Sequence, residues 1–243
     1  MKIKIVLLAA LILAFSSANF AQIAKVTPKK TGYQRTPKEG FEHKKTFTIT
    51  APKISGLSAA LNKKAETALS FERVFDLNVE EEKKEIFWLE EADYKIEYNK
   101  NGILSAALYV SGSGAYPSEY TKHVVVDLKT GNAVKAADVF VKLPKLARFA
   151  DRSLQARIKK EIAERRKDSA EDAKTMREMI AGAKFTPKNL EFFSVSDKGV
   201  SFYYDYGFPH VALALEPENR FFFTYAQIKP FIKPGGLLAG LVR

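Results

Sequence analysis

Residues 102–131, GILSAALYVSGSGAYPSEYTKHVVVDLKTG, decide the fold that the sequence predicts. Apolar residues recur at every second position on both sides of a central loop. They are Leu104, Ala106, Leu108 and Val110 before the loop, and Tyr120, Val124, Val126 and Leu128 after it. A period of two is typical of a strand with one buried face, and only Lys122 interrupts it. The stretch therefore predicts the two strands of a hairpin.

The loop between the two predicted strands is rich in small residues. It contains Ser111, Gly112, Ser113, Gly114, Ala115, Tyr116 and Pro117. Glycine is conformationally permissive and proline lacks a backbone donor, so neither strand continues easily through this segment. We expect loop 111–118 to be exposed and to let a partner approach its backbone, which makes it the candidate binding site.

The first residues predict export. Lys2 and Lys4 precede an apolar run from Ile5 to Phe15, and small residues follow up to Ala21. This order is typical of a secretory signal peptide, here residues 1–21, with cleavage after Ala18 or Ala21. The apolar run is shorter than the ~20 residues of a spanning helix, although a retained anchor is the alternative. We expect an extracytoplasmic protein, periplasmic or secreted, with no stable membrane anchor after cleavage.

The chain is basic, and its excess charge is concentrated in one region. The formal charge is +11 over 243 residues, and loss of Lys2 and Lys4 with the signal peptide leaves +9. Residues 142–188 hold fourteen Lys or Arg against seven Asp or Glu, on a predicted amphipathic helix. We name as the basic face Arg148, Arg152, Lys159, Lys160, Arg165 and Arg166. This face would favour an anionic wall polymer or lipid head groups, and a merely solvated helix face is the alternative.

The remaining pattern predicts an α+β protein with mostly antiparallel sheets and packed helices, in two intimately associated halves. Residues 22–43 contain Pro, Gly and Lys without apolar periodicity, which predicts a flexible arm. Residues 44–140 predict a strand that stops at Pro52, an amphipathic helix, a solvated charged stretch at 80–85, and further strands around the central hairpin. Residues 141–243 predict a long helix, a second hairpin and a short terminal helix. This length can bury a core without cysteines, of which there are none.

A search for catalytic patterns finds little. His43, His123 and His210 are scattered, and His123 falls on the polar side of its predicted strand, where we expect it to be exposed. Ser113 lacks the context of a nucleophile elbow, and the glycines beside it open no helix. We expect no metal, no cofactor and no catalytic residue. The carboxylates Glu90, Glu91 and Asp93 leave an acid and base pair as the alternative.

Several phrases in order resemble a known family: TFTITAPKISGL, ILSAALYVSGSGAYP, VVVDLKTGNAV and GVSFYYDYGFPH with FFFTYAQIKPFI. They resemble the paired extracytoplasmic domains of unknown function in the lysozyme-sensing anti-sigma factor RsiV and in the peptidoglycan deacetylase PdaC. The resemblance covers residues 44–233 and implies an α+β fold at the cell envelope. The family commonly has a histidine in the loop where this chain has Tyr116, and this chain lacks the deacetylase domain and the spanning anchor of those proteins.

The sequence therefore predicts an exported, non-catalytic, monomeric binding module that recognises a wall glycan or an envelope protein through loop 111–118. The alternatives are an envelope hydrolase or deacetylase-like enzyme, and a lysozyme-binding protein. A +9 protein repels cationic lysozyme at low salt, which disfavours that partner in the absence of an acidic patch. Export and the placement of the aromatic residues in predicted strands argue against nucleic acid as a partner.

Overall fold

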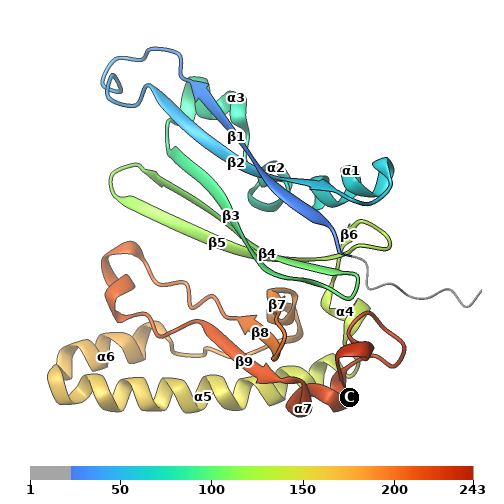
Figure 1. Cartoon of the computed structure of the whole chain (residues 1–243). Coiled ribbons are helices and arrows are strands. Elements are labelled where there is room, and N and C mark those ends of the chain that lie inside the picture. The colour runs from blue at the N-terminus through green and yellow to red at the C-terminus, as the bar shows by residue number, and fades with distance from the viewer. Residues whose placement is uncertain (1–22, 243) are drawn as a thin grey trace, which may run out of the picture.

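The computed structural model describes residues 23–242 and places a six-stranded sheet above a three-stranded sheet, with helices on the outer sides of both (Figure 1). The predicted signal peptide, residues 1–21, lies outside the described residues. Between residues 23 and 242, no helix is long and apolar enough to cross a membrane.

The larger sheet runs in chain order, so each strand neighbours the next one. Its strands are β1 (Lys25–Gln34), β2 (Thr46–Ser55), β3 (Leu89–Lys100), β4 (Ile103–Ser113), β5 (Pro117–Asp127) and β6 (Asn132–Ala133). Every pair is antiparallel except β2 and β3, which are parallel over Thr48–Ile49. The predicted central hairpin is β4 and β5, and its register runs from Ile103 opposite Asp127 to Ser113 opposite Pro117.

The parallel step from β2 to β3 requires a crossover, and helices supply it. They are α1 (Ala59–Ala68), α2 (Phe71–Phe75), α3 (Val79–Glu81) and one π-helical turn (Glu82–Ile86). The Ser58 hydroxyl caps α1 by accepting from the Leu61 amide at 3.3 Å. These helices cover one face of the sheet over a first core that includes Phe47, Leu69, Phe71, Leu104 and Leu108.

The second half contains the smaller sheet, whose order is β7, β8, β9. Its elements are α4 (Ala136–Val139), α5 (Leu143–Asp168), α6 (Ala170–Met179), β7 (Phe193–Val195), β8 (Gly199–Tyr203), β9 (Arg220–Thr224) and α7 (Tyr225–Ile228). A 3₁₀ turn (His210–Leu215) lies in the connection between β8 and β9. Phenylalanines dominate the core here, with Phe202 contacting Phe140, Phe185, Phe193 and Phe223.

The second half also covers the other face of the larger sheet, which corrects the prediction of a hairpin with one buried face. Ile103 and Val125 join the core of the second half, and Ser105 is buried between the two sheets. The Ser105 hydroxyl accepts a hydrogen bond from the Val195 amide at 3.2 Å. Most of β4 is therefore buried on both faces, which a period of two does not reveal.

The contact between the second half and the larger sheet also overturns the expectation that His123 is exposed. Its ring stacks on Tyr203 of β8, with centroids 3.6 Å apart and planes 9° from parallel. Its Nδ1 lies 3.1 Å from Glu97 Oε2, and only 11% of the side chain is accessible. The polar side of β5 is thus the contact surface of the second half, where His123 is a packing residue.

The prediction of a flexible arm over residues 22–43 is wrong for Lys25–Gln34. Strand β1 occupies Lys25–Gln34 and pairs with β2 along its whole length. Tyr33 stacks on Phe47 at 4.9 Å, which fixes one end of the strand to the core. β1 forms the edge of the sheet, where Pro28 and exposed lysines are tolerated. The strand predicted to begin near residue 44 was expected to stop at Pro52. Pro52 instead lies inside β2, opposite Pro28.

Candidate recognition site at the hairpin end

The candidate site is the end of the hairpin formed by β4 and β5. Gly112 is buried, Ser111 and Ser113 are half-buried, and residues 114–117 are exposed. Tyr116 is exposed, with 61% of its surface accessible. The bend is shorter than the exposed loop predicted over residues 111–118, because β4 extends through Ser113 and β5 begins at Pro117.

Trp88, which the sequence did not single out for binding, lies against the bend. A Cβ atom on Gly112 would come within 2.1 Å of the Trp88 carbonyl oxygen and within 2.9 Å of its indole ring. Gly112 is therefore required by close approach, because any side chain would displace the tryptophan. The indole Nε1 donates to the Ser118 hydroxyl at 3.2 Å, which orients the ring over the hairpin.

Tyr120 extends this aromatic surface along β5. Its ring centroid lies 5.8 Å from that of Trp88, and 58% of its surface is accessible. Ser118 and Tyr120 lie on the same face of β5 because they are two residues apart. Trp88, Ser118 and Tyr120 thus form an accessible aromatic surface with a hydroxyl beside the rings, and Tyr116 lies in the adjoining bend. We call these four residues together the hairpin-end surface.

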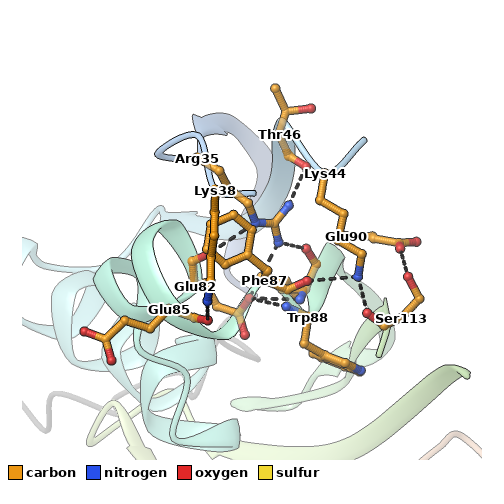
Figure 2. Close-up of polar contacts among 11 residues, drawn as sticks. Arg35, Lys38, Lys44, Thr46, Glu82, Glu85, Phe87, Trp88, Glu90 and Ser113 are labelled. Atoms are coloured by element: carbon orange, nitrogen blue, oxygen red, sulfur yellow. Dashed lines mark hydrogen bonds and ion pairs between the residues drawn. The ribbon is translucent and has the colours of Figure 1, made fainter. Parts of the chain in front are cut away.

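Polar contacts hold the Trp88 segment and the end of β4 in place (Figure 2). The Lys44 ammonium donates to the Phe87 carbonyl at 2.9 Å and to the Ser113 carbonyl. It thereby links the last residue of β4 to the segment that carries Trp88. The Ser113 hydroxyl also donates to the Glu90 carboxylate, which links β4 to β3.

An ion pair buried behind Trp88 completes this frame. The Arg35 guanidinium lies 3.6 Å from Glu82, and their side chains are 1% and 3% accessible. Arg35 also donates to the backbone carbonyls of Glu82, Thr46 and Leu89. Burial lowers the pKa of Arg35, while the charge of Glu82 and its hydrogen bond oppose that shift. The prediction of a purely solvated stretch at 80–85 is therefore wrong for Glu82.

Glu82 also fixes the backbone of Trp88 directly. Its carboxylate accepts from the Trp88 amide at 3.0 Å and from the Leu89 amide at 2.9 Å. The preceding chain forms a π-helical turn and then places Phe87 at φ +58°, a region that bulky residues rarely occupy. A π-helical turn and a positive φ at a bulky residue persist where surrounding contacts hold them in place. Both kinds of feature are frequent at functional sites.

His210 of the second half contacts the hairpin end. The His210 ring stacks on Tyr116 at 4.9 Å and 20°, and its Nε2 donates to the Pro117 carbonyl at 3.0 Å. Next to it, Val211 is 86% accessible and Leu213 is 45% accessible. The bend therefore lies beside an exposed apolar segment from a distant part of the chain.

The acidic residues weighed as an acid and base pair do not converge. Glu91 and Asp93 share the face of β3 that is directed toward the second half, whereas Glu90 contacts Ser113. Burial and the neighbouring Asp93 raise the pKa of Tyr109, which lies opposite Asp93 in β4. Within residues 23–242, no cluster of three His, Cys, Asp or Glu side chains could hold a metal ion.

The predicted basic face lies on α5, in the other layer of the molecule (Figure 1). Five of its residues are exposed and Arg165 is half-buried. Arg152 lies over the Phe149 ring at 5.3 Å, and Lys160 lies 3.8 Å from Glu164. The fold does not bring this face together with the hairpin-end surface.

The fold and the site define an α+β domain whose two sheets share one contact face and whose central hairpin ends in an exposed aromatic bend. No family model matches the sequence, and no curated protein matches it. Solved structures do resemble it. A DUF3298 family protein from Pseudomonas aeruginosa aligns with a TM-score of 0.56 at 11% identity, covering 87% of this chain and 94% of its own. A DUF3298 family member from Bacteroides fragilis aligns with a TM-score of 0.51 at 15% identity, covering 90% and 96%.

These two likenesses extend over nearly the whole of each chain and show the fold. They support the coarser part of the resemblance predicted from sequence, namely a domain of unknown function. At these identities they carry no activity, ligand or partner to this chain.

Proposed function

We propose that this chain is an exported, non-catalytic binding module of the cell envelope, and that the hairpin-end surface recognises a wall glycan. The observation that carries the proposal is the exposed Tyr120 beside Trp88, which buried contacts hold in place, with the exposed Tyr116 in the adjoining bend. Aromatic rings with nearby hydroxyl groups suit ligands that have both apolar and polar faces, as sugars do. A frame fixed before binding lowers the entropic cost of association.

Export rests on the charge and apolar pattern of residues 1–21. Ala24, three residues after Ala21, is hydrogen-bonded to the larger sheet. The Ala24 amide donates to Asn99 Oδ1 at 3.3 Å, and Asn99 Nδ2 donates to the Ala24 carbonyl at 2.6 Å. Cleavage after Ala21 would leave both of these hydrogen bonds in the mature chain. Sequencing the amino terminus of the protein recovered from a secreting host tests this step.

The binding test is co-sedimentation of the mature protein with purified insoluble peptidoglycan. We expect Tyr116→Ala and Tyr120→Ala each to weaken binding about tenfold, because exposed aromatic anchors dominate such surfaces. Phe222→Ala is the matched control, since Phe222 is an exposed aromatic residue of β9 outside the site. Equal binding by all three variants would contradict the proposal, as would release of soluble wall fragments by the wild-type protein.

The salt dependence of binding distinguishes recognition through the hairpin-end surface from recognition through the basic face of α5. Attraction between the exposed lysines and arginines and an anionic wall polymer is screened at about 1 M salt, whereas stacking on aromatic rings persists. We expect binding through the hairpin end to survive such salt. Complete loss at high salt, with no effect of the tyrosine substitutions, would assign binding to the basic face.

A cationic envelope protein such as lysozyme is the second candidate, and one observation favours it. Glu91, Ser111 and Glu119 are cross-strand neighbours, and Asp93 lies one row further along the same face. This basic chain therefore carries a local acidic surface beside the hairpin end. Binding of lysozyme that is lost in the Glu91→Gln, Glu119→Gln double variant, without binding to peptidoglycan, would support this candidate over the glycan.

A further inference from the structure

A second surface, which shares no residue with the hairpin-end surface, has the features of an anion site. It is a groove of about 340 Å³ between helix α1, the start of α2 and the turn that joins β5 to β6. Its lining residues are Ala60, Lys63, Lys64, Thr67, Ala68, Arg73, Gly131 and Asn132. The volume lies within the range of small-molecule sites in proteins.

Three cationic side chains line the groove and no carboxylate does. Lys63, Lys64 and Arg73 are exposed, and none of them forms an ion pair with another part of the chain between residues 23 and 242. Lys53 on β2 provides a contrast, because Glu66 neutralises it at 2.9 Å. The groove therefore concentrates positive charge that the protein itself does not compensate.

The floor of the groove is set by a close backbone approach. Gly131 has φ +72°, and a Cβ atom on it would lie 2.6 Å from Lys64 Cβ and 3.1 Å from the Leu61 carbonyl oxygen. Glycine lets the turn press against α1 here, and this fixes Asn132 beside the lysines. Ala60 and Ala68 leave the floor small and apolar, with space beyond that of a single inorganic anion.

We propose that this groove binds a phosphate ester, with Lys63, Lys64 and Arg73 on the phosphate and the alanines against the carbon atoms of the attached alcohol. A phosphate offers several oxygens at once, and guanidinium and ammonium groups are its usual partners. Either a lipid head group or a free phosphate ester has this chemistry. The site does not depend on the hairpin-end proposal, since the two share no residue.

The experiment is a calorimetric titration of the mature protein with glycerol 3-phosphate, together with flotation on phosphatidylglycerol vesicles. We expect saturable binding with a dissociation constant of about 1 mM at low salt for the soluble ester. The Lys64→Gln, Arg73→Gln variant should bind about tenfold more weakly, because two charge-assisted contacts are lost. The matched control is Lys159→Gln, Lys160→Gln, which removes the same charge from α5.

Each result either tests whether the site exists or identifies the source of its ligand. Weaker binding of glycerol 3-phosphate by the groove variant alone supports a free ester. The same selective loss seen only with vesicles supports the site with a lipid head group as its source. Equal losses in the groove and control variants would show diffuse attraction and overturn the site. Binding of neither probe by the wild-type protein would also overturn it.

Discussion

At the scale of single residues, glycines in the same loop have different roles. Gly112 lies where a side chain would collide with the backbone of Trp88, whereas the nearest atom to a Cβ on Gly114 is 3.9 Å away. The composition of the loop suggests flexibility, but only the packing of Trp88 shows that Gly112 is needed for space. The sequence predicted the loop, and it could not rank its glycines.

This difference gives a matched pair of substitutions. We expect Gly112→Ala to destabilise the protein by about 2 kcal/mol or more, because the added atom forces the backbone of β3 and β4 apart. Gly114→Ala should change stability by less than about 0.5 kcal/mol. Urea unfolding followed by tryptophan fluorescence measures both, since Trp88 is the only tryptophan. Similar losses for the two variants would contradict the packing argument.

The residues that fix Trp88 had no signal in the sequence. Arg35 and Lys44 fall in or next to the segment predicted to be a flexible arm, and Glu82 lies in a charged run that is typical of solvated helix ends. Their burial depends on the crossover from β2 to β3, which brings distant segments together. A pattern of charges cannot predict this, because it contains no long-range contact.

At the scale of elements, the sequence predicted the strands that have clear alternation and missed the edge strand. β4 and β5 alternate over many residues, and Asn101 and Gly102 form the turn from β3 into β4 with φ +57° and +77°. β1 combines Pro28, Gly32 and several lysines, which favour a loop when judged locally. Pairing with β2 overrides that preference.

Hydrogen exchange tests this correction. Amides of residues 26–34 that bond to β2 should exchange at least about a hundredfold more slowly than an unstructured peptide, because their opening requires loss of the edge strand. The comparison is the connection 36–43, which lies between β1 and β2 and carries no strand. Exchange at peptide rates throughout 26–34 would restore the prediction of a flexible arm.

At the scale of the whole molecule, the packing of the second half raises the pKa of two of its tyrosines. Burial raises the pKa of Tyr206 and of Tyr225, whose hydroxyl donates to the Ser196 carbonyl at 2.8 Å. Both tyrosines therefore keep their protons in the folded state at pH values where the unfolded chain, with a tyrosine pKa near 10, loses them. Their contribution to stability is full below about pH 10 and is lost as the pH rises above it.

We expect the urea midpoint to fall between about pH 9 and pH 11, and to fall less steeply in Tyr225→Phe, which has no proton to lose. Tyr33→Phe is the control, since Tyr33 lies in the edge strand β1 of the other half. A midpoint that is independent of pH in this range, or the same slope in Tyr225→Phe as in the wild type, would contradict the argument.

By itself the sequence determined the α+β class, the central hairpin with its exposed bend, and the basic face, because each depends on local periodicity or on composition. Only the tertiary structure decided that β4 is buried on both faces, that β1 is a strand, that His123 packs on Tyr203, and that Trp88 joins the bend. The physical reason is the same in each case. These features arise from contacts between segments far apart in the chain, and local patterns describe a single face or a single turn.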